Sequence, residues 1–235
     1  MPFLLHQLIE DTAQRTPDAV ALLLRDEPLS YGELFKAVSR VAGGLCDLGL
    51  RPNDRVAVYL PKCFEAVIAV FAATAAGGVF VPINPVLKPQ QVAHILRDSG
   101  ARFFVTSSER ANGTGDIVST CPELDSVVLL GRPNAEEASG YSIHWDELSR
   151  TTSPPNVPRI DSDMAAILYT SGSTGRPKGV VLSHSNLLAG ARSVASYLEN
   201  TDADRLLAVL PFSFDYGLSQ LTTAFDVGAS VVLID

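Results

Sequence analysis

Short apolar runs alternate with helix-length segments along most of this chain, and that alternation most restricts how it can fold. Residues 19–24, 54–60 and 79–81 are rich in Val, Ala and Leu and predict strands. Between them, residues 31–48 and 63–76 have the length and apolar pattern of helices. Strands that alternate with helices are typical of parallel βαβ units. We therefore expect an α/β fold of layered parallel sheets.

Caps and breakers mark the ends of these segments. Ser30 is a favourable N-cap, and Glu33 completes a capping box for the helix that begins at Tyr31. Gly49 then ends that helix. By the same criteria, further helices are predicted over 4–15, 89–98, 186–198 and about 216–227, and further strands over 101–105, 126–130, 164–169, 180–182, 206–209 and 229–234.

The clearest break in this pattern is residues 151–163, TTSPPNVPRIDSD, which combine several prolines with few apolar side chains. They predict a linker between a first α/β subdomain over 1–150 and the start of a second one over 164–235. The chain ends in ASVVLID, which has the composition of a buried strand. We therefore expect the second subdomain to be incomplete and the rest of the protein to follow as a continuation or as a partner chain.

The charge balance and the cysteines argue against several classes of protein. The formal net charge is −8, so basic side chains are not in excess and we expect no nucleic-acid partner. No apolar run approaches the roughly 18 residues of a membrane span, and the N-terminus lacks the basic start of a secretory signal. Cys46, Cys63 and Cys121 are odd in number and far apart, which fits neither a disulfide framework nor a zinc site. We expect a cytoplasmic protein.

The chemistry is concentrated in residues 169–179, YTSGSTGRPKG. The apolar run 164–169 leads directly into this segment, so a buried strand feeds a loop rich in Gly, Ser and Thr. Glycines let the backbone approach a ligand closely, and the N–H groups of such turns suit a phosphate. Lys178 adds a compact positive charge, and Pro177 prevents the loop from continuing as a helix. We expect a rigid anion-binding loop at the end of a core strand.

A flexible linker and the P-loop of nucleotide hydrolases are the alternatives for this segment. A linker does not need a lysine fixed behind a proline. The P-loop requires Gly, four residues and then Gly-Lys-Ser/Thr. Here Gly172 is followed by Gly175 and Lys178, and Gly179 stands where the hydroxyl side chain is required. The spacing therefore favours a different kind of phosphate loop.

The segment closely resembles the phosphate loop of the adenylate-forming superfamily, which includes acyl-CoA synthetases, firefly luciferases and the adenylation domains of peptide synthetases. That motif runs Tyr-Thr-Ser-Gly-Ser/Thr-Thr-Gly-x-Pro-Lys-Gly, and residues 169–179 match it at every fixed position. Residues 29–34 (LSYGEL) and 78–85 (GVFVPINP) resemble two earlier motifs of the superfamily, in the same order. The resemblance covers the N-terminal portion only, because the superfamily's adenine-contacting and ribose-binding stretches, its hinge and its mobile C-terminal domain are missing.

The resemblance implies that ATP activates a carboxylic acid as an acyl-adenylate, which an AMP-forming ligase then usually transfers to the thiol of CoA. The loop would hold the β- and γ-phosphates, and Thr174 would also meet the Mg²⁺ that accompanies ATP. The residues implied in ATP binding are Thr170, Ser171, Gly172, Ser173, Thr174, Gly175 and Lys178. No catalytic residue is assigned within the chain, and we expect the chain alone neither to adenylate nor to bind ATP tightly.

Phe214, Asp215 and Gly217 are the candidate substrate-binding residues, and they leave the substrate class open. In the superfamily, Phe-Asp at this place is typical of peptide-synthetase adenylation domains, whose aspartate holds an α-ammonium group, whereas the glycine matches acyl-CoA synthetases. The aspartate is equally suited to cap the helix predicted to follow it. We favour an acyl-CoA ligase. The alternatives are an amino-acid adenylation domain and a non-catalytic phosphate-binding half-protein that needs a partner chain.

His184 follows the loop in the string LSHSN. Histidines at this place in the superfamily precede an asparagine by two positions. We expect a partly buried histidine that holds the chain where it leaves the loop, rather than a catalytic base.

Overall fold

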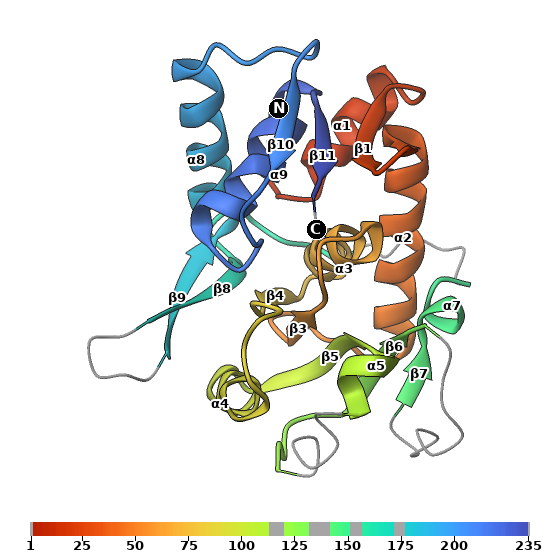
Figure 1. Ribbon diagram of the computed structural model, residues 1–235, viewed down its shortest axis with the longest axis vertical. Helices are drawn as coiled ribbons and strands as arrows, with labels where there is room; N and C mark the ends of the chain where they lie inside the picture. The colour runs from red at the N-terminus through yellow and green to blue at the C-terminus, as the bar shows by residue number, and fades with distance from the viewer. Residues whose placement is uncertain (1, 113–119, 132–141, 151–156, 172–176, 235) are drawn as a thin grey trace.

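The computed structural model describes residues 2–112, 120–131, 142–150, 157–171 and 177–234. The strands within these residues form two sheets (Figure 1). The larger has seven strands, β7 (Ser142–His144), β6 (Ser126–Leu130), β5 (Ala101–Ser107), β3 (Arg55–Tyr59), β4 (Val79–Pro82), β8 (Met164–Ser171) and β9 (Pro177–Ser183), in that order. The smaller has four, β10 (Arg205–Ala208), β11 (Ser230–Leu233), β1 (Val20–Leu24) and β2 (Glu27–Ser30).

Most neighbouring strands are parallel, as the alternation of strands and helices predicts. The α/β prediction is therefore confirmed. Two pairs depart from it, because β1 with β2 and β8 with β9 form antiparallel hairpins at the edges of their sheets. The connections in these hairpins are too short for the crossover that a parallel pair requires.

The described helices are α1 (Gln7–Arg15), α2 (Tyr31–Asp47), α3 (Phe64–Ala75), α4 (Pro89–Ser99), α5 (Ser108–Asn112), α7 (Trp145–Leu148), α8 (His184–Tyr197) and α9 (Asp215–Val227). The start of α2 shows the predicted capping box, since the Ser30 hydroxyl accepts the Glu33 N–H and the Glu33 carboxylate accepts the Ser30 N–H. Gly49 has a φ of +87° and ends the turn that follows α2. The elements that the sequence did not predict are short: β2, β7, α5 and α7.

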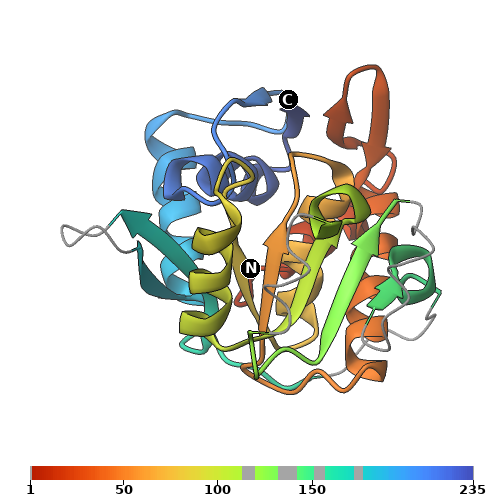
Figure 2. The ribbon, with the colours of Figure 1, turned by 60° about the horizontal axis from the view of Figure 1, so that its bottom comes forward.

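The two faces of the large sheet pack against different helices. Side chains such as Val56, Phe80 and Leu168 belong to a core that α2 and α3 share, whereas Ala57, Val81 and their neighbours pack against α4. In Figure 2, α4 lies in front of the large sheet, beside the β8–β9 hairpin. The helix α4 is therefore on the opposite face of the sheet from α2 and α3.

Both sheets combine strands from the two sides of the segment 151–163, of which residues 157–163 are described. Strands β8 and β9 extend the sheet that β3 to β7 begin, and β11, with β10 on its other side, pairs with β1. Tyr31 adds a buried link, because its hydroxyl donates to the Ala229 carbonyl at 2.6 Å. The division of the chain at 151–163 into two subdomains remains a prediction, and the shared sheets argue against independent folding of the two parts.

Candidate functional site

The β8–β9 hairpin positions the ends of the predicted phosphate loop. The buried run 164–169 is a strand, as predicted, and it continues to Ser171. Strand β9 begins at Pro177, so the predicted strand 180–182 is three residues longer at its start. In the ladder, Thr170 lies opposite Lys178 and Ser171 opposite Pro177. The structure therefore brings the first and last of the predicted phosphate-binding residues face to face.

Gly172, Ser173, Thr174 and Gly175 lie outside the described residues, and of Ser171 only the backbone pairing is described. Their part in ATP binding stays a prediction. Thr170 and Lys178 are both exposed, so a ligand at the end of the hairpin can reach them. Within the described part of the chain no ion pair to Lys178 is found, and its ammonium group is therefore available to an anion.

The two faces of the hairpin have different surroundings. Side chains alternate along a strand, so Lys178 and Leu182 share one face of β9 while Gly179 and Val181 share the other. At roughly 3.3 Å per residue, Lys178 lies about 13 Å along the strand from Leu182. Leu182 lines a groove formed mainly by α8, α9 and β10. The ammonium group that is predicted to hold phosphates thus stands on the same face as this groove.

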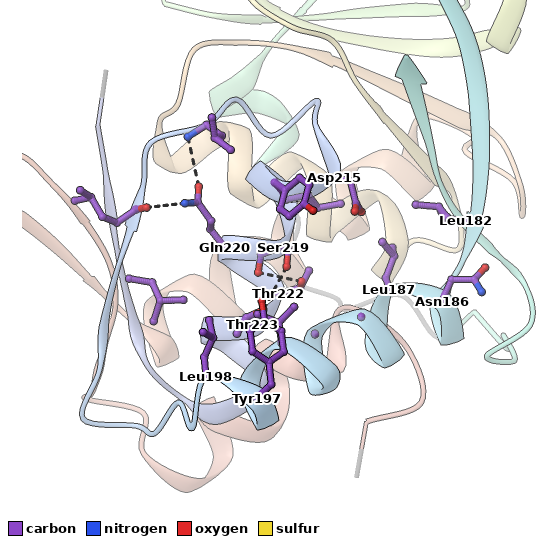
Figure 3. Close-up of a pocket in the computed structure, with 18 residues that line it drawn as sticks. Leu182, Asn186, Leu187, Tyr197, Leu198, Asp215, Ser219, Gln220, Thr222 and Thr223 are labelled. Atoms are coloured by element: carbon purple, nitrogen blue, oxygen red, sulfur yellow. Dashed lines mark hydrogen bonds between the residues drawn. The ribbon is translucent and has the colours of Figure 1, made fainter. Parts of the chain in front are cut away.

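The groove has a volume of about 570 Å³, within the usual range of small-molecule sites. Apolar side chains from α8 and β10 form much of its wall, and α9 contributes polar ones (Figure 3). Asp215 lies at the end of the groove where α9 begins, and Tyr197 and Leu198 lie at the opposite end (Figure 3). The labelled lining residues are Leu182, Asn186, Leu187, Tyr197, Leu198, Asp215, Ser219, Gln220, Thr222 and Thr223.

Asp215 is the first residue of α9, whereas the N-cap is Phe214. The capping role that the sequence allowed for Asp215 is therefore wrong, because Asp215 is the first residue of the helix and not its cap. The carboxylate is exposed and lines the groove. Its position in the first turn is favourable in its own right, because the helix N-terminus carries partial positive charge. A carboxylate that is not used in capping is available to a cationic group of a ligand.

Gly217 and Phe214 do not line the groove. A Cβ on Gly217 would lie 2.0 Å from the carbonyl oxygen of Pro211 and 3.0 Å from that of Leu210. The glycine is therefore required by the close approach of two backbone segments, so its match to one substrate class carries no information about the substrate. The Phe214 side chain is 48% exposed, outside the groove. Of the three predicted substrate residues, the structure places Asp215 alone in the groove wall.

Ser219, Thr222 and Thr223 are lining residues that the sequence reasoning missed. They follow Asp215 at i+4, i+7 and i+8, the spacing of one helix face. The helix predicted after Asp215 places these three residues on the same helix face as Asp215, so this spacing could have identified them. Gln220 also lines the groove, and its amide donates to the Leu207 carbonyl at 2.8 Å, which ties α9 to β10.

His184 is buried more completely than predicted, at 1% exposure. Its Nδ1 accepts the backbone N–H of Leu5 at 3.1 Å, so it joins the start of α8 to the segment before α1. Burial first, and then the positive charge of Arg159, lower the pKa of His184 to about 4. The ring is therefore neutral at pH 7 and has a structural role.

Within the described residues, no group of three or more His, Cys, Asp or Glu side chains is placed to hold a metal ion. No helix in the same part of the chain is long and apolar enough to cross a bilayer.

Comparison with known sequences and structures bears on these features. The model of a protein family described as "AMP-binding enzyme" matches residues 9–235. Phosphinothricin tripeptide synthetase PhsC from Streptomyces viridochromogenes is 35% identical over 230 residues, which cover 97% of this chain and 20% of that protein.

Solved structures resemble the fold over nearly the whole chain. The anthranilate CoA ligase AuaEII, in complex with anthranoyl-AMP, matches with a TM-score of 0.92 and 26% identity, over 100% of this chain and 46% of that one. The N-terminal domain of FACL13 from Mycobacterium tuberculosis matches with a TM-score of 0.85 and 25% identity, over 99% of this chain and 57% of that one. The chain thus spans about half the length of these structures and a fifth of the synthetase.

Proposed function

This chain belongs to the AMP-binding enzyme family, and from that premise we propose that the protein containing it activates a carboxylic acid as an acyl-adenylate. In this reaction a substrate carboxylate oxygen attacks the α-phosphorus of ATP. The bond between the α-phosphorus and the bridging oxygen breaks, and pyrophosphate leaves. The observation that carries the proposal is the hairpin register, which sets Thr170 of β8 directly opposite Lys178 of β9, on the two sides of the predicted phosphate loop.

The hairpin's part in the reaction is electrostatic. Negative charge accumulates on the β- and γ-phosphates as pyrophosphate departs, and a fixed ammonium group stabilises that charge without having to reorganise. Lys178 supplies this group from a strand, and Thr170 supplies a hydroxyl donor beside it. Ser171, Gly172, Ser173, Thr174 and Gly175 complete the proposed phosphate contacts.

Mg²⁺ is expected to arrive with ATP, where it would neutralise charge on the phosphates. Among the described residues, no group of three or more His, Cys, Asp or Glu side chains is placed to hold a metal ion. Mg²⁺ in such sites keeps several waters and binds through substrate phosphates with one or two protein groups. Thr174, the proposed protein contact, lies outside the described residues.

We propose CoA as the acceptor of the acyl group and the cytoplasm as the place of the reaction. We also propose that residues 1–235 alone neither adenylate nor bind ATP tightly, because the expected contacts to adenine and ribose are not among them. Isothermal titration of this polypeptide with MgATP tests the last point. A dissociation constant in the micromolar range would contradict it.

Amino-acid adenylation is the second candidate, and Asp215 specifically favours it. Its carboxylate is exposed in the groove wall and is not engaged in capping α9. A charge-assisted hydrogen bond from a substrate ammonium group to such a carboxylate is worth about 1.5–3 kcal/mol. The glycine that matches acyl-CoA synthetases is explained by packing against Pro211 and gives no support to either candidate.

Substrate-dependent pyrophosphate exchange by the full-length enzyme tests the proposal and separates the candidates. The panel pairs α-amino acids with the same acids lacking the amino group. If amino acids are the substrates, Asp215→Asn should lower kcat/KM for them by about 10- to 100-fold and leave the matched acids unchanged.

Asp202→Asn is the matched control, because it removes an exposed carboxylate outside the groove. If simple carboxylic acids are the substrates, neither variant should change kcat/KM. Absence of exchange with every acid in the panel would refute adenylation itself.

A further inference from the structure

Helix α4 contacts both strands of the hairpin at the base of the phosphate loop. The Tyr169 hydroxyl donates to the Asp98 carboxylate at 2.7 Å, on the strand that enters the loop. The His94 Nε2 lies 3.1 Å from the carbonyl oxygen of Pro177, on the strand that leaves it. One helix thus holds both ends of a segment to which it is not adjacent in sequence.

In both hydrogen bonds, the chemistry of the groups decides which is the donor and which is the acceptor. A carbonyl oxygen only accepts, so the Nε2 of His94 carries the hydrogen in its contact with Pro177. The carboxylate of Asp98 accepts from Tyr169, and hydrogen bonds to ionised groups are stronger than neutral ones. Burial first, and then this hydrogen bond, raise the pKa of Tyr169, so its hydroxyl keeps its proton at neutral pH.

The hairpin is also packed tightly on the side that faces α4. Tyr169 lies opposite Gly179 in the ladder. A Cβ on Gly179 would lie 2.7 Å from Ile167 Cγ2 and 3.3 Å from the Tyr169 ring. Ile167 and Tyr169 pack in turn on the core that α4 contributes. Glycine therefore lets the tyrosine ring lie close to β9, where its hydroxyl reaches α4.

Each residue held by α4 is next to a residue proposed to bind phosphate. Tyr169 precedes Thr170, and Pro177 precedes Lys178. Because side chains alternate along a strand, Thr170 and Lys178 project from the face opposite Tyr169 and Gly179. Fixing the hairpin from behind therefore determines where the hydroxyl and the ammonium group stand in front.

We propose that Asp98 and His94 are positioning residues that set the phosphate-binding geometry of Thr170 and Lys178 through their contacts with Tyr169 and Pro177. The proposal rests on the proposed function, since the phosphates are those of ATP. Both residues lie behind the hairpin, opposite the face from which Thr170 and Lys178 project. Their effect should therefore be on the binding of MgATP rather than on that of the carboxylate.

The test uses the full-length enzyme, with MgATP and the carboxylate varied separately in pyrophosphate exchange. Tyr169→Phe keeps the ring and removes the hydroxyl, and Asp98→Ala removes the acceptor. Each should raise KM for MgATP about tenfold and leave KM for the carboxylate within about twofold. Asp98→Asn keeps an acceptor oxygen and should recover most of the loss. Gln90→Ala, at an exposed position of α4, is the control and should match the wild type.

The double variant Tyr169→Phe/Asp98→Ala adds a second criterion. Its KM should be no higher than that of the worse single variant, because both changes remove one contact. For the other anchor, His94→Gln keeps an N–H donor for the Pro177 carbonyl and should stay near the wild type, whereas His94→Leu should raise KM for MgATP.

Equal KM values for MgATP in Tyr169→Phe, Asp98→Ala and the wild type would overturn the proposal, as would matching rises in KM for both substrates. If Asp98→Ala does not fold, judged by circular dichroism, Tyr169→Phe decides alone. If the wild type shows no exchange, the proposed function fails, and calorimetric MgATP binding decides the inference. Weaker binding by Tyr169→Phe then supports positioning, and unchanged binding overturns it.

Discussion

Replacing His184 with glutamine should remove an acid-sensitive part of the stability of this fold. The ring is buried, accepts the Leu5 N–H, and lies near the positive charge of Arg159 and the carboxylates of Asp161 and Asp163. Its pKa is lowered from the usual 6.5 to about 4, by burial most and by Arg159 next. A glutamine side-chain oxygen can accept the same N–H but does not titrate.

The direction of this pKa shift decides whether stability rises or falls with pH. The folded protein disfavours the charged ring, so the contribution of His184 to stability is complete above about pH 6.5 and decreases as the pH falls towards 4. A shift from 6.5 to about 4 corresponds to about 3 kcal/mol once the pH is below both values. Between pH 7.5 and pH 5, the same linkage gives a loss of about 2 kcal/mol.

His6 adds to this acid-dependent loss of stability, because burial and then the neighbouring His184 lower its pKa to about 4 as well. Protonating either ring therefore disfavours protonation of the other. The losses of stability caused by protonating His6 and His184 are therefore coupled, and only their sum for the pair is well defined. His184→Gln should relieve the second of the two causes that lower the pKa of His6.

Urea unfolding of the polypeptide 1–235, followed by the fluorescence of its single tryptophan, Trp145, measures the prediction. The difference in unfolding free energy between the wild type and His184→Gln should change by about 2 kcal/mol between pH 7.5 and pH 5, with the wild type losing more. Ser185→Ala is the control, because it alters the neighbouring side chain without removing a titratable group. A difference that stays constant across this pH range would refute the reasoning.

Three further changes have expected outcomes. Gly217→Ala should cost about 1–3 kcal/mol of unfolding free energy, because its Cβ would overlap the Pro211 carbonyl; an unchanged urea midpoint would contradict this. Tyr31→Phe leaves the buried Ala229 carbonyl without its 2.6 Å partner and should cost about 1–3 kcal/mol by the same assay, whereas a neutral result would mean that the carbonyl finds another donor. Lys178→Ala should slow pyrophosphate exchange by the full-length enzyme about a hundredfold with an unchanged circular dichroism spectrum; equal rates would exclude the proposed role.

Local patterns were enough to predict the longer elements. Helix α2 begins at Tyr31, as the cap at Ser30 indicates, and α4 begins at its predicted proline, Pro89. These features depend on neighbours within a few residues, so the chain's own order contains the information. The elements β2 and β7 escaped prediction, because each is four residues or shorter; β2 becomes a strand through its hairpin with β1, and β7 through pairing with β6.

The direction of β9 could not be predicted from the pattern of apolar residues. An apolar run followed by a Gly-rich loop and another apolar run is compatible with a parallel pair or with a hairpin. The structure has a hairpin, and its register places Thr170 opposite Lys178. The sequence placed the loop between two predicted strands, 164–169 and 180–182, and the structure added their antiparallel pairing.

The order of residues alone predicted a phosphate-binding role for the segment 169–179 and was enough to identify the family and the α/β class, because these depend on residue types at short, regular spacing. Tertiary packing decided that α4 supports the hairpin from behind, that Asp215 opens onto a groove, and that Gly217 is needed against Pro211. The physical reason is that such contacts join segments distant in sequence, and the face a side chain presents is defined only when its neighbours are in place.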